Sequence, residues 1–100
     1  MDMQGETPLV SAVITTHDRK ELAEKAIHSV LNQTYQNMEL IVVDDKSTKE
    51  HSEYIRAIAE SKGFRYIYIP AEESKGGNHA RNVGIHSSKG ELIAFLDDDD

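Results

Sequence analysis

Four short runs of β-branched and other apolar residues recur along the chain, each bounded by polar residues, glycine or proline. Runs of this length and composition are typical of buried strands. We therefore expect strands at residues 10–15, 39–43, 64–69 and 91–96.

Longer, more polar segments separate these runs. In residues 16–33 the apolar side chains return every three or four positions, which predicts an amphipathic helix. The same spacing in residues 47–63 predicts a second helix that ends at Gly63. Residues 76–90 predict a third helix, which glycines open and Gly90 stops.

Two of these helices carry a capping signature at their start. Asp18 is followed three residues later by Glu21, and Ser47 is followed at the same spacing by Glu50. In this arrangement the first side chain accepts a hydrogen bond from the helix backbone. We therefore expect Asp18 and Ser47 to cap the first and second helices.

The predicted order is βαβαβαβ, which is typical of an α/β fold with parallel strands and right-handed crossovers. The fold class expected is Rossmann-like, a mostly parallel sheet with flanking helices. We expect residues 1–8 to be a disordered leader and residues 9–100 to form the domain. Since no helix follows the last strand, we expect the sheet to be the N-terminal part of a larger domain.

The composition narrows the possible partners. The net charge is −7, which argues against nucleic acid, because nucleic-acid surfaces need lysine and arginine patches. There is no cysteine, so disulfides and thiolate metal sites are excluded. No apolar run approaches the ~18 residues of a membrane span, and the polar start does not resemble a signal peptide. We therefore expect a cytoplasmic protein, held at the inner face of a membrane only if further parts of it provide the anchor.

Candidate chemistry follows from the sheet. In an open parallel sheet, ligands bind beyond the carboxyl ends of the strands. Residues at these ends include polar groups after the first strand, an acidic pair after the second and a run of aspartates after the fourth. They are Thr15, Thr16, His17, Asp18, Asp44, Asp45, residues 70–73 and residues 97–100.

The four terminal aspartates suggest a cation site. In an extended chain, Asp97 and Asp99 point one way while Asp98 and Asp100 point the other. Two carboxylates ~4 Å apart repel each other by about 1 kcal/mol in water, and a hard dication such as Mg²⁺ or Mn²⁺ relieves this repulsion. The alternative interpretation is an acidic terminus that binds nothing specific.

The remaining candidates each have a plainer interpretation. One member of the pair Asp44 and Asp45 would cap the loop or second helix, while the other accepts hydrogen bonds from a ligand. Lys75 precedes the two glycines of this segment and Arg81 follows them. Both could bind a phosphate or ribose, although Arg81 could instead pair with an aspartate. The five histidines show no metal spacing, and we interpret them as mostly solvated.

Four motifs together resemble the nucleotide-binding half of family 2 glycosyltransferases, which have the GT-A fold. They are "VSAVITTHDR", "SVLNQTYQNMELIVVDDKST", "NHARNVGI" and "KGELIAFLDDDD". The likeness covers residues 9–100, and four motifs in the right order make it specific. It implies that a nucleotide-diphosphate sugar, with UDP as the expected nucleotide, lies across the strand ends.

The resemblance also implies residue roles. Thr15, Thr16 and His17 stand beside the nucleobase, where the family has Pro-Thr-Tyr or a close variant. Asp45 matches the aspartate that contacts uracil, with Asp44 beside it.

Two further segments match the family pattern. Arg81 falls near the base and diphosphate, and Lys75 belongs to the same basic segment. Asp97, Asp98 and Asp99 match the Asp-x-Asp signature that reaches ribose and metal, so Asp97 and Asp99 are the metal ligands expected.

Lys46 departs from the family pattern, because it stands where the family often has glycine or asparagine.

The implied reaction is an inverting displacement, in which an acceptor hydroxyl of a glycan or other molecule attacks the anomeric carbon. Mn²⁺ or Mg²⁺ at the diphosphate stabilises the leaving group. The family's catalytic base lies downstream of Asp-x-Asp, so we expect this segment alone to bind nucleotide and not to transfer sugar. An uncovered sheet edge also makes self-association of the segment an expectation.

Three other interpretations stay open at this point. A glycosyltransferase-like domain without activity would serve as a nucleotide-binding module. A receiver-type regulatory domain would need its acidic pair after the first strand, not the second. A dinucleotide-dependent oxidoreductase would need a GxGxxG motif after the first strand, which is missing.

Overall fold

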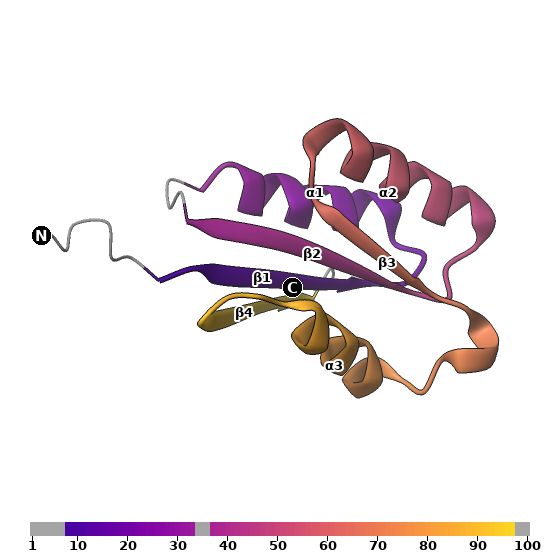
Figure 1. Cartoon of the computed structure of the whole chain (residues 1–100). Coiled ribbons are helices and arrows are strands. Elements are labelled where there is room, and N and C mark those ends of the chain that lie inside the picture. Colours follow the sequence, from indigo (N-terminus) through magenta and orange to yellow (C-terminus); the bar gives the residue numbers. More distant parts are fainter. Residues whose placement is uncertain (1–7, 34–36, 98–100) are drawn as a thin grey trace, which may run out of the picture.

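The computed structural model describes residues 8–33 and 37–97 as alternating strands and helices (Figure 1). In chain order they are β1 Val10–Thr16, α1 Lys20–Leu31, β2 Met38–Asp45, α2 Lys49–Lys62, β3 Arg65–Ile69, the short 3₁₀ helix η2 Ala71–Glu73, α3 Gly77–Ser87 and β4 Leu92–Asp97. All seven predicted strands and helices are present. The expected leader, apart from Pro8, and Asp98 to Asp100 lie outside the described residues.

The four strands form one parallel sheet in the order β3-β2-β1-β4. The chain adds β2 and β3 on one side of β1 and then crosses back to place β4 on the other side. This change of direction makes the β1–β4 boundary the topological switch point of the sheet, beside which ligands bind in doubly wound folds. The predicted fold class, an α/β Rossmann-like parallel sheet, is confirmed.

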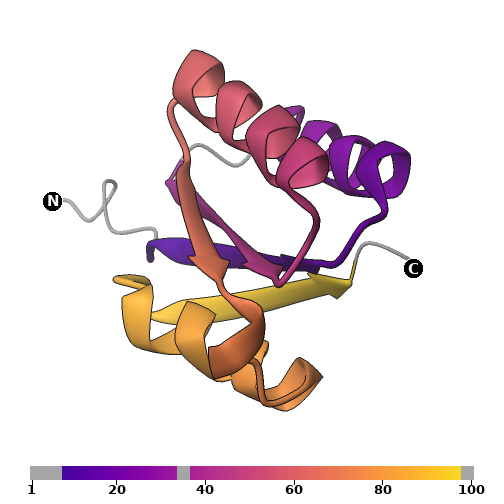
Figure 2. The ribbon, with the colours of Figure 1, turned by 90° about the vertical axis from the view of Figure 1, so that its right-hand side faces the viewer.

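Helices cover both faces of the sheet. The pair α1 and α2 lies on one face and α3 lies on the other, as the end-on view shows (Figure 2). Along β1, Ala12 and Ile14 pack with Ile27 of α1 and Ile55 of α2, whereas Val13 belongs to a separate cluster on the other face. The alternation of strand side chains thus builds two cores, one on each face.

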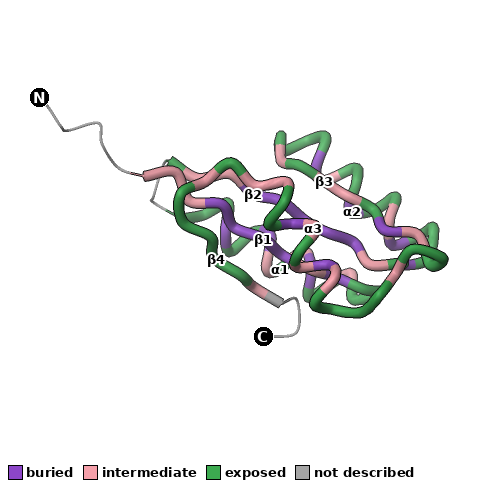
Figure 3. The backbone as a smooth tube through the Cα atoms, turned by 60° about the horizontal axis from the view of Figure 1, so that its bottom comes forward, coloured by how far each residue is buried: buried purple, intermediate pink, exposed green. Residues whose placement is uncertain are grey.

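Burial is uneven across the sheet. The central strands β1 and β2 are mostly buried, while β4 at one edge is exposed along most of its length (Figure 3). Leu92 and Phe95 of β4 are 55% and 45% exposed. Among the described residues, no helix combines the length and apolar character that a membrane crossing needs.

A glycine lets α3 approach the sheet closely. A Cβ atom at Gly84 would lie 2.5 Å from Cγ1 of Val13 and 3.4 Å from Cγ2 of Val43. Both valines belong to the α3-side core. The contact therefore has no room for one further methyl group.

Polar contacts connect the amino ends of the strands, opposite the carboxyl ends that carry the candidate residues. The Glu39 carboxylate accepts hydrogen bonds from the Ser11 hydroxyl and from the Lys89 backbone N–H, and Arg65 lies 4.0 Å away. Burial disfavours the charged form of Glu39. The Ser11 and Lys89 hydrogen bonds outweigh that effect, so the pKa of Glu39 lies below its ordinary value.

Replacing Gly84 with alanine tests the close packing of α3. We expect Gly84→Ala to lower the free energy of unfolding by about 1–3 kcal/mol, because the added methyl group overpacks the core. Urea unfolding measures the loss. Gly77→Ala is the matched control, since a Cβ there meets nothing within 4 Å. Equal stability of the two variants would contradict the packing argument.

The depressed pKa of Glu39 makes stability depend on pH. Its contribution is fully present above the ordinary glutamate pKa of 4.5 and is lost as the pH falls through the lower folded value. We expect Glu39→Gln to be less stable than the unmodified chain at pH 7, with the gap closing as the pH falls below 4.5. Unfolding curves recorded across this range check the trend, and a gap that stays constant would refute it.

Candidate functional site

The strand ends that carry the candidate residues meet at one edge of the sheet. Thr15 of β1 pairs in register with Asp97 of β4, and Thr16 pairs with Asp44 of β2. Asp45 ends β2 next to Ile69 of β3. The structure thus brings the ends of β1, β2 and β4 together, as the sequence predicts. The side chain of Asp97 and the whole of Asp98 and Asp99 lie outside the described residues, so their predicted roles stay predictions.

Strand alternation separates the two carboxylates of the β2 end. Val42 belongs to the core under α1 and α2, and Val43 to the core under α3. Asp44 therefore continues the α1–α2 side of the strand, and Asp45 continues the α3 side. The two neighbours have different environments for this reason.

Asp44 is fully buried and serves the loop that follows β2. Its Oδ2 accepts a hydrogen bond from the Tyr66 hydroxyl at 2.6 Å, and its Oδ1 accepts one from the Ser47 backbone N–H at 3.3 Å. Burial, and then the hydrogen bond to Asp44, raise the pKa of Tyr66 far above its ordinary value. Tyr66 thus remains a hydrogen-bond donor to Asp44.

The carboxylate of Asp45, unlike that of Asp44, is not fully hydrogen-bonded within the described residues. Its Oδ1 atom is buried and has no hydrogen-bond partner among the described residues, while the side chain as a whole is half-buried. A buried carboxylate oxygen without a donor costs free energy, about 1–3 kcal/mol or more for a charged group. Of the two aspartates, Asp45 is the one whose acceptor capacity remains unused by the fold.

His17 lies directly beside Asp45. Its Nδ1 donates to the Asp45 backbone carbonyl at 2.7 Å, and its side chain is 50% exposed. Because a carbonyl only accepts, Nδ1 carries the hydrogen. The hydrogen bond holds the imidazole ring beside the end of β2 with half of its surface exposed, and its Nε2 lies 3.7 Å from Asp18 Oδ2.

Asp18 holds two loops of the site together, which corrects its expected role. The N-cap of α1 is Arg19, without a side-chain hydrogen bond, so the predicted cap by Asp18 is wrong. Asp18 has a left-handed backbone (φ 51°), and its carboxylate accepts from the Thr48 N–H at 2.8 Å at the start of α2. Its own N–H donates to the Ser47 hydroxyl at 2.9 Å. The left-handed turn therefore directs Asp18 to the other loop.

The α2 cap also differs from the prediction by one residue. Thr48, not Ser47, is the N-cap, and its hydroxyl accepts from the His51 N–H at 3.5 Å. The Ser47 hydroxyl instead accepts a hydrogen bond from the Asp18 N–H. The hydrogen bond from the Thr48 backbone lowers the pKa of Asp18, although partial burial raises it. The charged carboxylate suits the positive end of the α2 dipole.

The backbone conformation of Lys46 shows why the family often has glycine or asparagine at this position. It has φ 56°, and its N–H donates to the Ile69 carbonyl at 2.8 Å. A left-handed backbone favours glycine or asparagine, the residues that the family often has at this position. Lys46 therefore keeps the turn but adopts a backbone conformation that is costly for a lysine.

The basic candidates lie on and before α3. Arg81 is half-buried on the helix and donates to the Asn78 side chain at 3.1 Å, and Lys75 is exposed in the preceding segment. Arg81 therefore lies on the same face of the sheet as Asp45. The predicted roles of Lys75 and Arg81 also stay predictions.

His51 is a residue that the sequence interpretation missed. Only 5% of it is exposed, which corrects the view that the histidines are mostly solvated for this position. It lies in the first turn of α2, and its Nε2 is 3.5 Å from the hydroxyl of the buried Thr16. Helical spacing from Ile55 and Ala59, both buried on α2, was the available signal.

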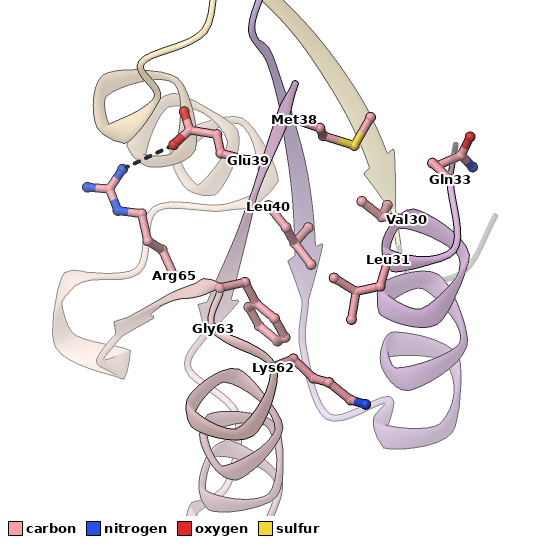
Figure 4. Close-up of a pocket in the computed structure, with 10 residues that line it drawn as sticks. Val30, Leu31, Gln33, Met38, Glu39, Leu40, Lys62, Gly63 and Arg65 are labelled. Atoms are coloured by element: carbon pink, nitrogen blue, oxygen red, sulfur yellow. Dashed lines mark ion pairs between the residues drawn. The ribbon is translucent and has the colours of Figure 1, made fainter. Parts of the chain in front are cut away.

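A sizeable cavity lies near the amino ends of β2 and β3, opposite the candidate strand ends (Figure 4). It has a volume of about 430 Å³ and is lined by the ends of α1 and α2 and the starts of β2 and β3, including Leu31, Met38, Leu40 and Arg65. The strand ends of the candidate site do not contribute to it. No group of three or more histidine, cysteine or acidic residues within residues 8–33 and 37–97 could hold a metal ion.

Comparisons with known proteins agree with the fold. Residues 11–100 match the family model Glycosyl transferase family 2. The UDP-Glc:α-D-GlcNAc-diphosphoundecaprenol β-1,3-glucosyltransferase WfaP of Escherichia coli is 40% identical over 92 residues, which are 92% of this chain and 36% of that protein. The chain spans from 13% to 37% of the length of the curated relatives it matches.

Two solved structures share the fold. The mannosyltransferase PcManGT from Pyrobaculum calidifontis, in complex with GDP-Man and Mn²⁺, has a TM-score of 0.78 and 26% identity over 92% of this chain and 28% of its own. Residues 1–349 of Staphylococcus aureus TarS, in complex with UDP-GlcNAc, have a TM-score of 0.73 and 26% identity over 91% of this chain and 26% of their own. The two bound donors carry different nucleobases.

The capping role of Asp18 leads to a test. We expect Asp18→Ala to lower the free energy of unfolding by about 1 kcal/mol or more, because it removes the acceptor for the Thr48 N–H. Asp18→Asn is the control, since asparagine keeps a cap acceptor and tolerates a left-handed backbone. Urea unfolding of the two variants decides, and equal losses would show that the cap contributes nothing.

Proposed function

Because this chain belongs to glycosyl transferase family 2, we propose that its protein transfers a glycosyl group from a nucleotide-diphosphate sugar, with UDP as the nucleotide, to a hydroxyl acceptor. The observation that carries the proposal is the buried Oδ1 of Asp45 at the convergent strand ends, which has no hydrogen-bond partner among the described residues. A ligand that brings an N–H or O–H donor to this oxygen would remove the cost of leaving it unpaired.

The nucleobase is assigned to the Asp45 side of the site. An ionised carboxylate only accepts hydrogen bonds, which suits the imide N–H of uracil. His17, fixed by its hydrogen bond to the Asp45 carbonyl, offers a half-exposed ring on which a flat base can stack. Thr15 lies on the same strand-end edge, and Thr16 beside it is buried.

The diphosphate is assigned to the side of α3 and β4. Arg81 and Lys75 supply positive charge, and Arg81 lies on the same face of the sheet as Asp45. Arginine forms a planar fork of donors that matches phosphate oxygens. This division places base recognition at β2 and phosphate recognition nearer α3.

A divalent cation, Mn²⁺ or Mg²⁺, fits the donor chemistry of the β4 end. Asp97, whose backbone pairs with Thr15, would hold it together with Asp99, and Asp98 would reach the ribose. Carboxylate oxygens are ligands that such hard cations prefer. When bound, the cation supplies charge stabilisation to the departing diphosphate.

Transfer with inversion completes the proposal. An acceptor hydroxyl of a glycan or other molecule attacks the anomeric carbon from the side opposite the nucleoside diphosphate. One relative acts on an undecaprenol-linked sugar by its name, so a lipid-linked saccharide is the acceptor class we propose. A lipid-linked acceptor would bring the protein to the inner face of a membrane.

Substitution of Asp45 tests the proposal. We expect Asp45→Asn to weaken UDP binding by about tenfold or more, because the amide presents a donor where uracil also donates. Isothermal titration with UDP, in the presence and absence of Mn²⁺, measures the loss. Stability should not fall, since Oδ1 has no described partner to lose.

The matched control for this charge change is Glu60→Gln, an exposed acid near the end of α2 and away from the candidate strand ends, which should bind UDP as the unmodified chain does. Unchanged UDP affinity of Asp45→Asn, or absence of UDP binding by the unmodified chain, would overturn the proposal.

A further inference from the structure

Beneath the strand ends lies a buried polar cluster that the proposed binding site does not use. It consists of Thr16 from β1, Asp44 from β2, His51 from α2 and Tyr66 from β3. Thr16, Asp44 and His51 are 3%, 0% and 5% exposed. The cluster therefore joins three adjacent strands and a helix within the core, directly under the edge that would hold the nucleotide.

The imidazole of His51 lies between two of the other members. Its Nε2 is 3.5 Å from the Thr16 hydroxyl, and its Nδ1 is 3.5 Å from Asp44 Oδ2. Nδ1 is buried and has no hydrogen-bond partner among the described residues. Both separations are long for a hydrogen bond, so the ring contacts both groups without a tight bond to either.

The charge of Asp44 decides which ring nitrogen carries the hydrogen. If Nδ1 were unprotonated, its lone pair would face a carboxylate oxygen, and the two would repel each other in a buried environment. With the hydrogen on Nδ1 the contact becomes attractive. In the neutral ring Nε2 is then an acceptor, and the Thr16 hydroxyl is the donor that faces it.

Register makes this contact relevant to the strand ends. Thr16 of β1 pairs with Asp44 of β2. Each has a candidate binding residue as its neighbour in the chain: Thr15 precedes Thr16, and Asp45 follows Asp44. A side chain that contacts both members of the pair therefore lies against the backbone from which Thr15 and Asp45 project.

We propose that His51 is a positioning residue for nucleotide binding: its Nδ1–H faces Asp44 and its Nε2 faces the Thr16 hydroxyl, which fixes the ends of β1 and β2. The inference rests on the proposed function, because it takes these strand ends as the nucleotide site. It adds a buried side chain that does not touch the nucleotide but sets the positions of groups that do.

Three variants separate the parts of the interaction. His51→Phe keeps a planar ring without nitrogen, His51→Asn keeps a donor near the Nδ1 position, and His51→Gln reaches toward the Nε2 position. We expect His51→Phe to weaken UDP binding by about tenfold and His51→Asn to recover part of that loss. His28→Phe, at an exposed position of α1, is the matched control and should bind UDP normally.

Two ligand-free measurements test positioning independently of UDP. The ¹⁵N shifts of the His51 ring in the unmodified chain should report a hydrogen on Nδ1. Amide hydrogen exchange at Thr16 and Asp45 should be about tenfold faster in His51→Phe than in His28→Phe, while exchange in the centre of β2 stays unchanged. If His51→Phe does not fold, the ring measurement still decides, and His51→Gln, which lacks a group at the Nδ1 position, should then show weaker UDP binding and faster exchange at Thr16 and Asp45 than His28→Phe.

The outcomes separate the two proposals. Failure of the unmodified chain to bind UDP overturns the proposed function, and the ring and exchange measurements then judge His51 alone. Normal UDP affinity in folded His51→Phe overturns the positioning role and leaves the proposed function in place. A ring with no hydrogen on Nδ1, or unchanged exchange at Thr16 and Asp45, also overturns the positioning role.

Discussion

The buried carboxylate of Asp44 is the constraint on which the ligand-facing edge depends. A charge with no solvent exposure is costly unless donors surround it. Here the donors come from two different parts of the chain, the Tyr66 hydroxyl of β3 and the Ser47 N–H of the following loop, and the ring of His51 on α2 lies 3.5 Å away. Satisfying this carboxylate therefore fixes the relative positions of two strands and a loop.

The neighbouring loops are tied to each other for a related reason. Asp18, after β1, caps the start of α2 and bonds Ser47, while the Tyr68 hydroxyl donates to the Ser47 carbonyl at 2.9 Å. Two non-glycine residues, Asp18 and Lys46, adopt left-handed backbones to make these turns. Backbone strain of this kind persists where surrounding contacts hold it, and it often collects at binding sites.

The two ends of the parallel strands differ in how fully their carboxylates are hydrogen-bonded. At the amino ends, Glu39 is satisfied by Ser11 and the Lys89 N–H, so its charge stabilises the fold. At the carboxyl ends, Asp45 retains a buried oxygen without a described donor. A protein that evolved for stability alone would satisfy both, whereas a ligand site needs one group left available.

The sequence by itself determined the order of strands and helices and the parallel α/β class, because apolar periodicity and turn residues are local properties, and it pointed to the strand ends as the candidate site. It also determined the family, through four motifs in order. It left the two aspartates of β2 undivided, placed the Asp18 cap on the wrong helix and took His51 as solvated. Only the tertiary structure decided these points, because each depends on residues 28 to 35 positions away in the chain. The packing of helices on the two faces of the sheet gives Asp44 and Asp45 different environments. A left-handed turn directs Asp18 to α2, and the packing of α2 on the sheet buries His51 against Thr16.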